Sequence, residues 1–214
     1  MWGSRVARSG LTLNEPRPQE VDDQSDRVNR YLNFLVDALM LGLIAFVMHR
    51  TATSSTQVGL RFDSWKRDAV VGVFAATLLI AAQGLMLRRL PLDPRHAFTS
   101  RVRKGSPVLW VFIFAGGAFS EELWVALCLV VLREATHSVI LPVVATLVVF
   151  AAMHYSYGLW GAMAAGAKEM VSALLFLHFG SLVVTFSYHF IGNLGSLYWN
   201  RYSRHVNRMK PGGG

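Results

Sequence analysis

The chain has 214 residues, of which 53% are hydrophobic and 16% are charged, and its mean hydropathy is +0.36. These values exclude an ordinary soluble domain, in which about a quarter of the residues are charged. The net charge of +8 does not indicate nucleic-acid binding, because the basic residues lie between apolar runs and no nucleic-acid-binding motif accompanies them. The composition therefore predicts a membrane protein.

Six apolar runs follow one another along the chain. Crossing a bilayer takes roughly 17 to 25 helical residues, and each run is long enough or nearly so. The runs are residues 31–48, 69–87, 108–132, 139–155, 158–177 and 182–199. We therefore expect an all-α polytopic membrane bundle of about six transmembrane helices. One integral membrane domain would cover residues 31–200, between a polar tail at 1–30 and a basic tail at 201–214.

Basic residues are distributed unevenly between the two sides of such a bundle. With a cytoplasmic N-terminus, fifteen Lys and Arg residues fall on the inner side, six of them in residues 88–104, against five on the outer side. The positive-inside rule expects this bias. We therefore expect both termini to be cytoplasmic.

The N-terminal half of the chain carries few candidates for chemistry. Residues 1–30 contain two prolines and five acids against five arginines, which is typical of a disordered or surface-lying tail. Asp37, in the first apolar run, is expected at the level of the lipid head groups. We interpret the second run as scaffold, and the basic segment 88–106 either as a contact with anionic head groups or simply as a topological stop.

The third run places two adjacent carboxylates, Glu121 and Glu122, near the middle of an otherwise apolar helix. An acidic side chain at the centre of a membrane helix costs roughly 2.5 to 3.5 kcal/mol on insertion scales, so the pair indicates a functional site. Three more polar side chains lie within later runs: His154 in the fourth, and His189 and Asn193 in the sixth. His189 and Asn193 are four residues apart and therefore share one helix face.

These residue types allow several kinds of chemistry. A carboxylate and an imidazole can remove a proton from a water that attacks a carbonyl, and a histidine with an asparagine amide can donate hydrogen bonds to the oxyanion. One Glu and two His could instead hold a divalent metal such as zinc, although neither an HExxH pair nor a cysteine set is present. The polar groups could also line an ion path in a transporter, or join helices as structural contacts.

The fifth run contains the adjacent pair Lys168 and Glu169 among small residues that allow close helix packing. Adjacent helical positions diverge by about 100 degrees, so the two side chains cannot pair along one face. Each is expected to have a partner on another helix. Cys128 is the one cysteine of the chain, which excludes an intramolecular disulfide.

Three segments together resemble a known family. The segments Ala118 to Trp124, Phe150 to His154 and His189 to Leu194 are similar in order and spacing to the EExxxR, FxxxH and HxxxN/D motifs of the CPBP family. This family comprises the CAAX protease and bacteriocin-processing membrane proteins, also called the Abi family. The resemblance covers roughly residues 107–200, the motif core.

The resemblance implies a glutamate-type intramembrane endopeptidase. Glu121 and His154 would activate the attacking water, His189 and Asn193 would bind the oxyanion, and Glu122 would be a supporting carboxylate. No cofactor is expected, and a divalent metal such as zinc stays an open alternative.

The resemblance also implies the partners, which are the lipid bilayer and a membrane-associated protein or peptide substrate, in some relatives a prenylated one. The chain is similar to smaller bacterial forms, so we expect it in the bacterial inner (plasma) membrane. The alternative is a catalytically inactive scaffold, immunity protein or transport component with the same fold.

One position departs from the family pattern. Ala126 stands where EExxxR has its arginine, so Glu122 lacks a cation four residues along the same face. We hypothesise that Lys168 replaces this arginine as the cation near Glu122.

Overall fold

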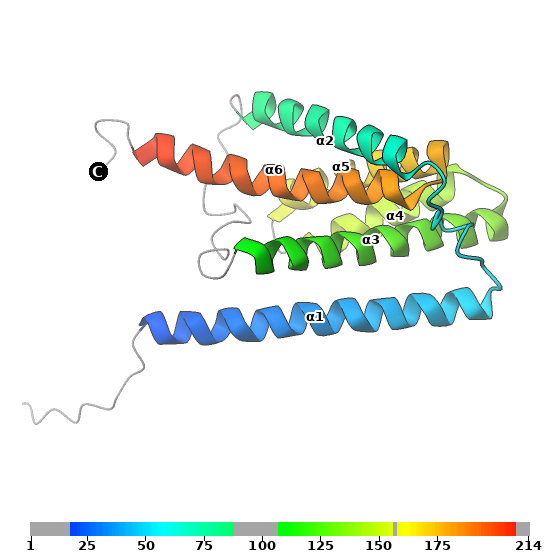
Figure 1. Ribbon diagram of the computed structural model, residues 1–214, viewed down its shortest axis with the longest axis horizontal. Helices are drawn as coiled ribbons and strands as arrows, with labels where there is room; N and C mark the ends of the chain where they lie inside the picture. The colour runs from blue at the N-terminus through cyan, green and yellow to red at the C-terminus, as the bar shows by residue number, and fades with distance from the viewer. Residues whose placement is uncertain (1–17, 88–106, 156–157, 209–214) are drawn as a thin grey trace, which may run out of the picture.

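The computed structural model describes residues 18–87, 107–155 and 158–208 (Figure 1). Within these residues the chain forms helices and no strand. The helices are α1 (Pro18–Arg50), α2 (Trp65–Leu87), α3 (Pro107–Thr136), α4 (Ile140–Met153), α5 (Gly158–Phe179) and α6 (Leu182–Arg208). The prediction of an all-α bundle is confirmed, and each apolar run lies within or largely overlaps one helix.

Three helices in the described part of the chain are long and apolar enough to cross a membrane. These spans are Trp65–Leu85 of α2, Val111–Thr136 of α3 and Gly161–Phe179 of α5. α4 is apolar but has only 14 residues, about 21 Å of helix against a hydrocarbon core of about 30 Å.

Many large apolar side chains cover the outside of the bundle, among them Phe34, Phe74 and Phe112, which are 76%, 63% and 70% exposed. Contiguous apolar surface of this kind suits lipid and not water. Together with the spanning helices, it makes the chain an integral membrane protein.

Two helices extend beyond the predicted membrane domain. α1 begins at Pro18, inside the segment expected to be a tail, and α6 continues to Arg208, past residue 200. Proline suits the first turn of a helix, and residues 19–30 contain neither glycine nor a further proline to interrupt it. The polar ends of both helices therefore continue the apolar parts. Residues 1–17 and 209–214 lie outside the described residues.

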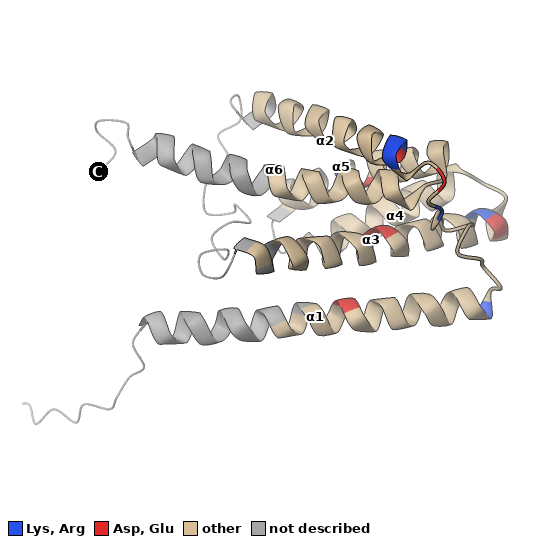
Figure 2. Cartoon of the chain, in the orientation of Figure 1, with Lys and Arg blue, Asp and Glu red and all other residues tan. Residues whose placement is uncertain are grey.

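Successive helices run in alternating directions, so that Pro18 and Arg208 lie at the same end of the bundle (Figure 1). The expectation that both termini are cytoplasmic stays a prediction. Figure 2 shows basic positions at the opposite end, where α1 and α3 finish and α2 begins. The basic segment 88–106 lies outside the described residues.

Glycines allow two close helix contacts in the bundle. A Cβ atom at Gly72 would overlap the carbonyl oxygen of Val184 and would lie 3.0 Å from the backbone nitrogen of Tyr188, so α2 approaches the α6 backbone directly. A Cβ atom at Gly166 would lie 3.1 Å from the side chain of Ala151 on α4. The expectation that small residues in the fifth run permit close packing is confirmed there.

Candidate active site

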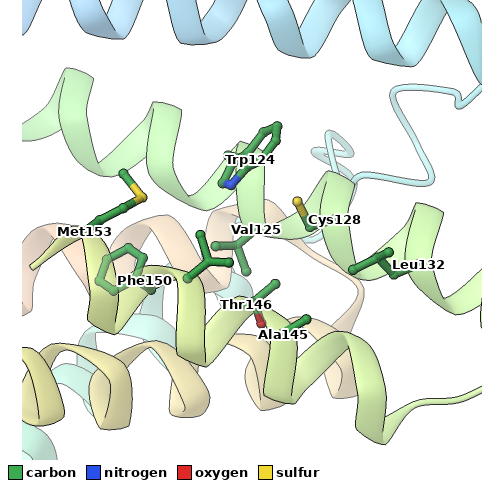
Figure 3. A pocket seen from close by; sticks show the side chains of 9 residues that line it. Trp124, Val125, Cys128, Leu132, Ala145, Thr146, Phe150 and Met153 are labelled. Atoms are coloured by element: carbon green, nitrogen blue, oxygen red, sulfur yellow. The ribbon is translucent and has the colours of Figure 1, made fainter.

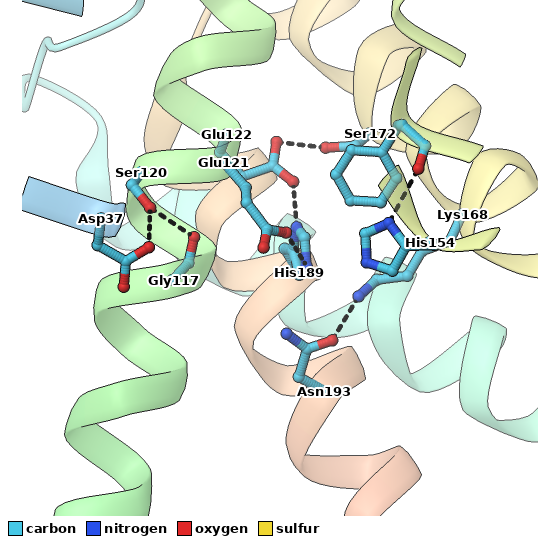
Figure 4. Close-up of polar contacts among 11 residues, drawn as sticks. Asp37, Gly117, Ser120, Glu121, Glu122, His154, Lys168, Ser172, His189 and Asn193 are labelled. Atoms are coloured by element: carbon cyan, nitrogen blue, oxygen red, sulfur yellow. Dashed lines mark hydrogen bonds and ion pairs between the residues drawn. The ribbon is translucent and has the colours of Figure 1, made fainter. Parts of the chain in front are cut away.

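α3 is the central helix of the bundle and contacts α1, α4, α5 and α6. The side chain of Glu122 is 2% exposed, whereas that of Glu121 is 29% exposed. Adjacent positions of a helix point about 100 degrees apart, which accounts for the difference. One carboxylate of the pair is therefore enclosed by protein, and the other lies at the edge of the site (Figure 4).

Both oxygens of the buried Glu122 carboxylate have partners. Its Oε1 lies 2.6 Å from His189 Nδ1, and its Oε2 accepts a hydrogen bond of 2.6 Å from the Ser172 hydroxyl. Ser172 and His189 are themselves 1% and 3% exposed. Because a carboxylate can only accept, Nδ1 is the protonated nitrogen of the imidazole in this contact. The buried charge is thus satisfied by α5 and α6 together.

His189 stands between the two carboxylates of α3. Its other nitrogen, Nε2, lies 3.4 Å from Glu121 Oε2. One carboxylate therefore faces each ring nitrogen and fixes the orientation of the ring (Figure 4). The structure brings together Glu121, Glu122 and His189, which the sequence predicted as site residues on two separate apolar runs.

His154 follows the last turn of α4. Its Nδ1 lies 2.9 Å from the carbonyl oxygen of Phe150, and the two rings stack with their centroids 4.4 Å apart. The Phe150 ring also meets the His189 ring edge to face at 6.1 Å. With Nδ1 donating to a carbonyl, Nε2 is the nitrogen of His154 that can accept a proton. Phe150 therefore both orients His154 and links it to His189.

Asn193 is held by the cation of α5. Its Oδ1 accepts a hydrogen bond of 2.6 Å from Lys168 Nζ. This contact assigns the amide oxygen as the acceptor, and the amide nitrogen is then the group that can donate to a ligand. A Cβ atom at Gly192 would lie 3.5 Å from Lys168 Cε, so the glycine leaves room for this side chain. Figure 4 shows Lys168, Asn193 and His154 around one region.

Lys168, hypothesised as the cation near Glu122, interacts electrostatically with that carboxylate, but among the described residues it is not a direct partner of Glu122. Within the described residues the direct partners of Glu122 are Ser172 and His189, and Lys168 attracts Glu121 and Glu122 only at longer range. Ala126 is 1% exposed inside an apolar cluster. The serine and the histidine are thus the direct partners of Glu122, and Lys168 is a cation at longer range whose role in place of the arginine stays a prediction.

Asp37 does not lie where a head-group position would put it. Its Oδ1 accepts a hydrogen bond of 3.1 Å from the hydroxyl of Ser120, which is 0% exposed and adjacent to Glu121. Asp37 thus contacts α3 near the middle of that helix (Figure 4). The expectation of a head-group position was wrong because an apolar run in the sequence does not show which neighbouring helix will supply a partner for a polar side chain within it.

Two further polar residues of α5 belong to this region and were not predicted as site residues. They are Ser172 and Glu169, which is 1% exposed. Both lie within one helical turn of Lys168, and this run of polar residues in an apolar helix was the available signal. Ligand atoms of Glu122, Glu169 and His189 lie within 4.8 Å of one another and could hold a metal ion.

An apolar cavity of about 70 Å³ lies between α3 and α4 (Figure 3). It is lined by Trp124, Val125, Cys128, Leu132, Ala145, Thr146, Val149, Phe150 and Met153. Phe150 is shared between this cavity and the histidine cluster. The polar centre and an apolar space therefore adjoin across one aromatic ring.

The fold and this centre define a helical membrane protein in which carboxylates, imidazoles and an amide from four helices meet in the interior. Residues 103–195 match the family model described as Type II CAAX prenyl endopeptidase Rce1-like. The matched region contains all five predicted site residues, and the match confirms the resemblance to the CPBP family. No curated protein and no solved structure matches the chain.

Proposed function

We propose that this protein is an intramembrane endopeptidase that hydrolyses a peptide bond of a membrane-associated protein or peptide. The observation that carries the proposal is the position of His189, with Glu122 at 2.6 Å on one ring nitrogen and Glu121 at 3.4 Å on the other. The match to a protease family supports the same activity. A lipidated substrate is the form that the description of that family suggests.

In the proposed reaction, Glu121 is the carboxylate that meets the attacking water, because it is the more exposed of the pair. Glu121 and Nε2 of His154 take up the proton as the water oxygen bonds to the carbonyl carbon. The same proton then passes to the amine nitrogen as the carbon–nitrogen bond breaks. Glu122 does not contact the substrate in this scheme and instead holds the His189 ring in place.

The oxyanion would be stabilised by donors on α6. The amide nitrogen of Asn193 can donate because Lys168 occupies its oxygen at 2.6 Å. When His189 carries a proton on both nitrogens, Nδ1 donates to Glu122 and Nε2 can donate to the oxyanion. Removing one such donor usually costs on the order of 10² to 10³ in rate.

The apolar cavity between α3 and α4 supports an apolar substrate segment. Its lining includes Trp124, Cys128 and Met153, and also Phe150, the ring that stacks on His154. A hydrophobic side chain or lipid-like group placed there would contact the Phe150 ring, which stacks on His154 of the proposed water-activating pair. Burial of apolar surface contributes roughly 25 cal/mol per Å² and would retain such a substrate.

The test is cleavage of a membrane-tethered peptide library by purified protein, with products identified by mass spectrometry. We expect Glu121→Gln to reduce product formation at least about 100-fold, because the amide cannot accept the proton. Glu134→Gln is the matched control, since Glu134 is an exposed acid of the same helix that accepts a hydrogen bond from Gln57. Equal products from wild type and Glu121→Gln, or none from wild type, would favour the inactive scaffold, immunity or transport alternative.

A further inference from the structure

We propose that Glu122, Glu169 and His189 form a binding site for one divalent transition-metal cation in the interior of the bundle. The three side chains come from α3, α5 and α6 and are 2%, 1% and 3% exposed. The site includes Glu169, which has no part in the proposed hydrolytic mechanism. It can therefore be tested without knowing the substrate.

The three side chains are close enough to share one ion. Their ligand atoms lie within 4.8 Å of one another. Two ligands about 2.1 Å from one cation are at most about 4.2 Å apart, so side-chain rotations that shift the atoms by less than about 1 Å suffice. Glu122 Oε1 and His189 Nδ1 lie 2.6 Å apart in a hydrogen bond, and the cation would replace the proton that they share. Glu169 is the ligand that would complete the set.

The buried carboxylate of Glu169 indicates that this site binds a ligand. Neither of its carboxylate oxygens, both of them buried, has a hydrogen-bond partner among the described residues. Buried polar side-chain atoms in proteins are nearly always paired, because an unpaired buried carboxylate is very costly. The neighbouring Lys168 attracts this carboxylate but forms no hydrogen bond with it, and its ammonium group donates to Asn193 instead. A cation next to Glu122 and His189 would satisfy this carboxylate.

The charges of the region agree with a divalent ion. Glu121, Glu122 and Glu169 all attract the ammonium group of Lys168, and the carboxylates of Glu121 and Glu122 repel that of Glu169. With the carboxyl groups ionised and the histidines neutral, this set carries three negative charges and one positive charge. A cation of charge +2 makes it neutral, which lowers the cost of burying it.

The ligand types favour a transition metal. Imidazole suits zinc and iron, and carboxylate oxygens suit manganese, whereas the site offers no thiolate. Ser172 donates to Glu122 Oε2 and would orient that ligand, as partners of metal ligands commonly do. The nitrogen of His189 that faces Glu122 is Nδ1. A cation there leaves the ring proton on Nε2, the nitrogen that faces Glu121.

This set differs from the one Glu and two His considered from the sequence. His154 directs Nδ1 to the Phe150 carbonyl oxygen and stacks on that ring. His154 is therefore not one of the three converging ligands, which are Glu122, Glu169 and His189. A cation bound by three protein ligands keeps at least one coordination position for water, as in catalytic zinc sites.

The experiment measures metal content and thermal stability of the full chain in detergent. Protein stripped with a chelator is dialysed against Zn²⁺ or Mn²⁺ alone, and bound metal is counted by mass spectrometry. We expect about one ion per chain of wild type and of the control Glu134→Gln, with a rise in Tm on loading. We expect Glu169→Gln to bind at least about tenfold more weakly and to lose that rise.

Stability without metal separates this role from a purely structural one. Stripped Glu169→Gln should melt at the same temperature as stripped wild type or higher, because glutamine has the size of the glutamate side chain and carries no charge that would have to be buried. A wild type without bound metal or a Tm rise, or a Glu169→Gln that keeps its ion, would overturn the proposal. Because no substrate is involved, this failure would be distinct from a failure of the proposed peptidase activity.

Discussion

α1 and α3 are both long helices with an acidic side chain in an apolar stretch, but their surroundings differ. α3 contacts four other helices, and its Glu122 is 2% exposed with both oxygens bonded. α1 lies on the outside of the bundle and packs mainly against α3, and its half-buried Asp37 bonds Ser120 (Figure 1). An acid in an apolar helix therefore marks a chemical centre when several helices surround it with polar partners.

Substituting His189, the α6 residue that contacts both carboxylates of α3, should reduce peptide cleavage more than any other change considered. His189→Ala removes the contact of both Glu121 and Glu122, so we expect a rate loss on the order of 10² to 10⁴. Glu122 would also lose a buried partner, which lowers the free energy of unfolding by about 1 to 3 kcal/mol. Cleavage assays and denaturant titration in micelles measure the two effects. His178→Ala, at an exposed histidine, should behave as wild type.

Lys168 should influence the rate through Asn193 and not through substrate binding. Lys168→Met removes the donor to Asn193 Oδ1, and the amide can then rotate away from the oxyanion. We expect kcat to fall about tenfold with little change in KM, since the interaction is made in the transition state. Lys168→Arg should restore part of the rate. A change confined to KM would contradict this role.

Two buried serines provide a smaller, matched comparison. Ser172→Ala removes a hydrogen bond to the Glu122 carboxylate and should lower the free energy of unfolding by about 1 to 2 kcal/mol. Ser181→Ala should change it by less than about 0.5 kcal/mol, because the Ser181 hydroxyl has no partner among the described residues. Denaturant titration of both variants tests the difference. Equal effects would mean that Glu122 does not depend on the Ser172 bond.

The contact of α1 with α3 should be the weakest of these interactions. A double-mutant cycle with Asp37→Ala and Ser120→Ala should give a coupling energy of about 0.5 to 1 kcal/mol, typical of one hydrogen bond. Peptide cleavage should change less than about threefold, because neither residue contacts the proposed substrate. A coupling near zero, or a loss of activity comparable to that of His189→Ala, would remove the contrast between α1 and α3.

The sequence predicted the helices and the five site residues because each depends on local properties. Apolar runs of membrane length set the helices, and polar residues within them stand out, as Glu121 and His189 do. Whether these five residues act as proposed stays a prediction. The direct contacts of His189 with Glu121 and Glu122, by contrast, follow from the structure.

The partners of these residues were harder to predict, since they depend on how the helices are rotated against one another. Spacing alone did not show that Ser172 would meet Glu122, or that Lys168 would meet Asn193. Asp37 was misplaced for the same reason. The start of α1 at Pro18 was missed because a polar sequence is compatible with both a tail and a solvated helix.

The close approach at Gly72 has a consequence for the modularity of the chain. α2 carries none of the site residues and lies outside the matched segment 103–195, yet its backbone abuts that of Tyr188, the residue before His189. α2 therefore acts as a spacer that sets the position of α6. The matched segment is thus not a self-sufficient unit, and grafting it onto another pair of helices would misplace His189 unless a glycine-sized contact were grafted with it.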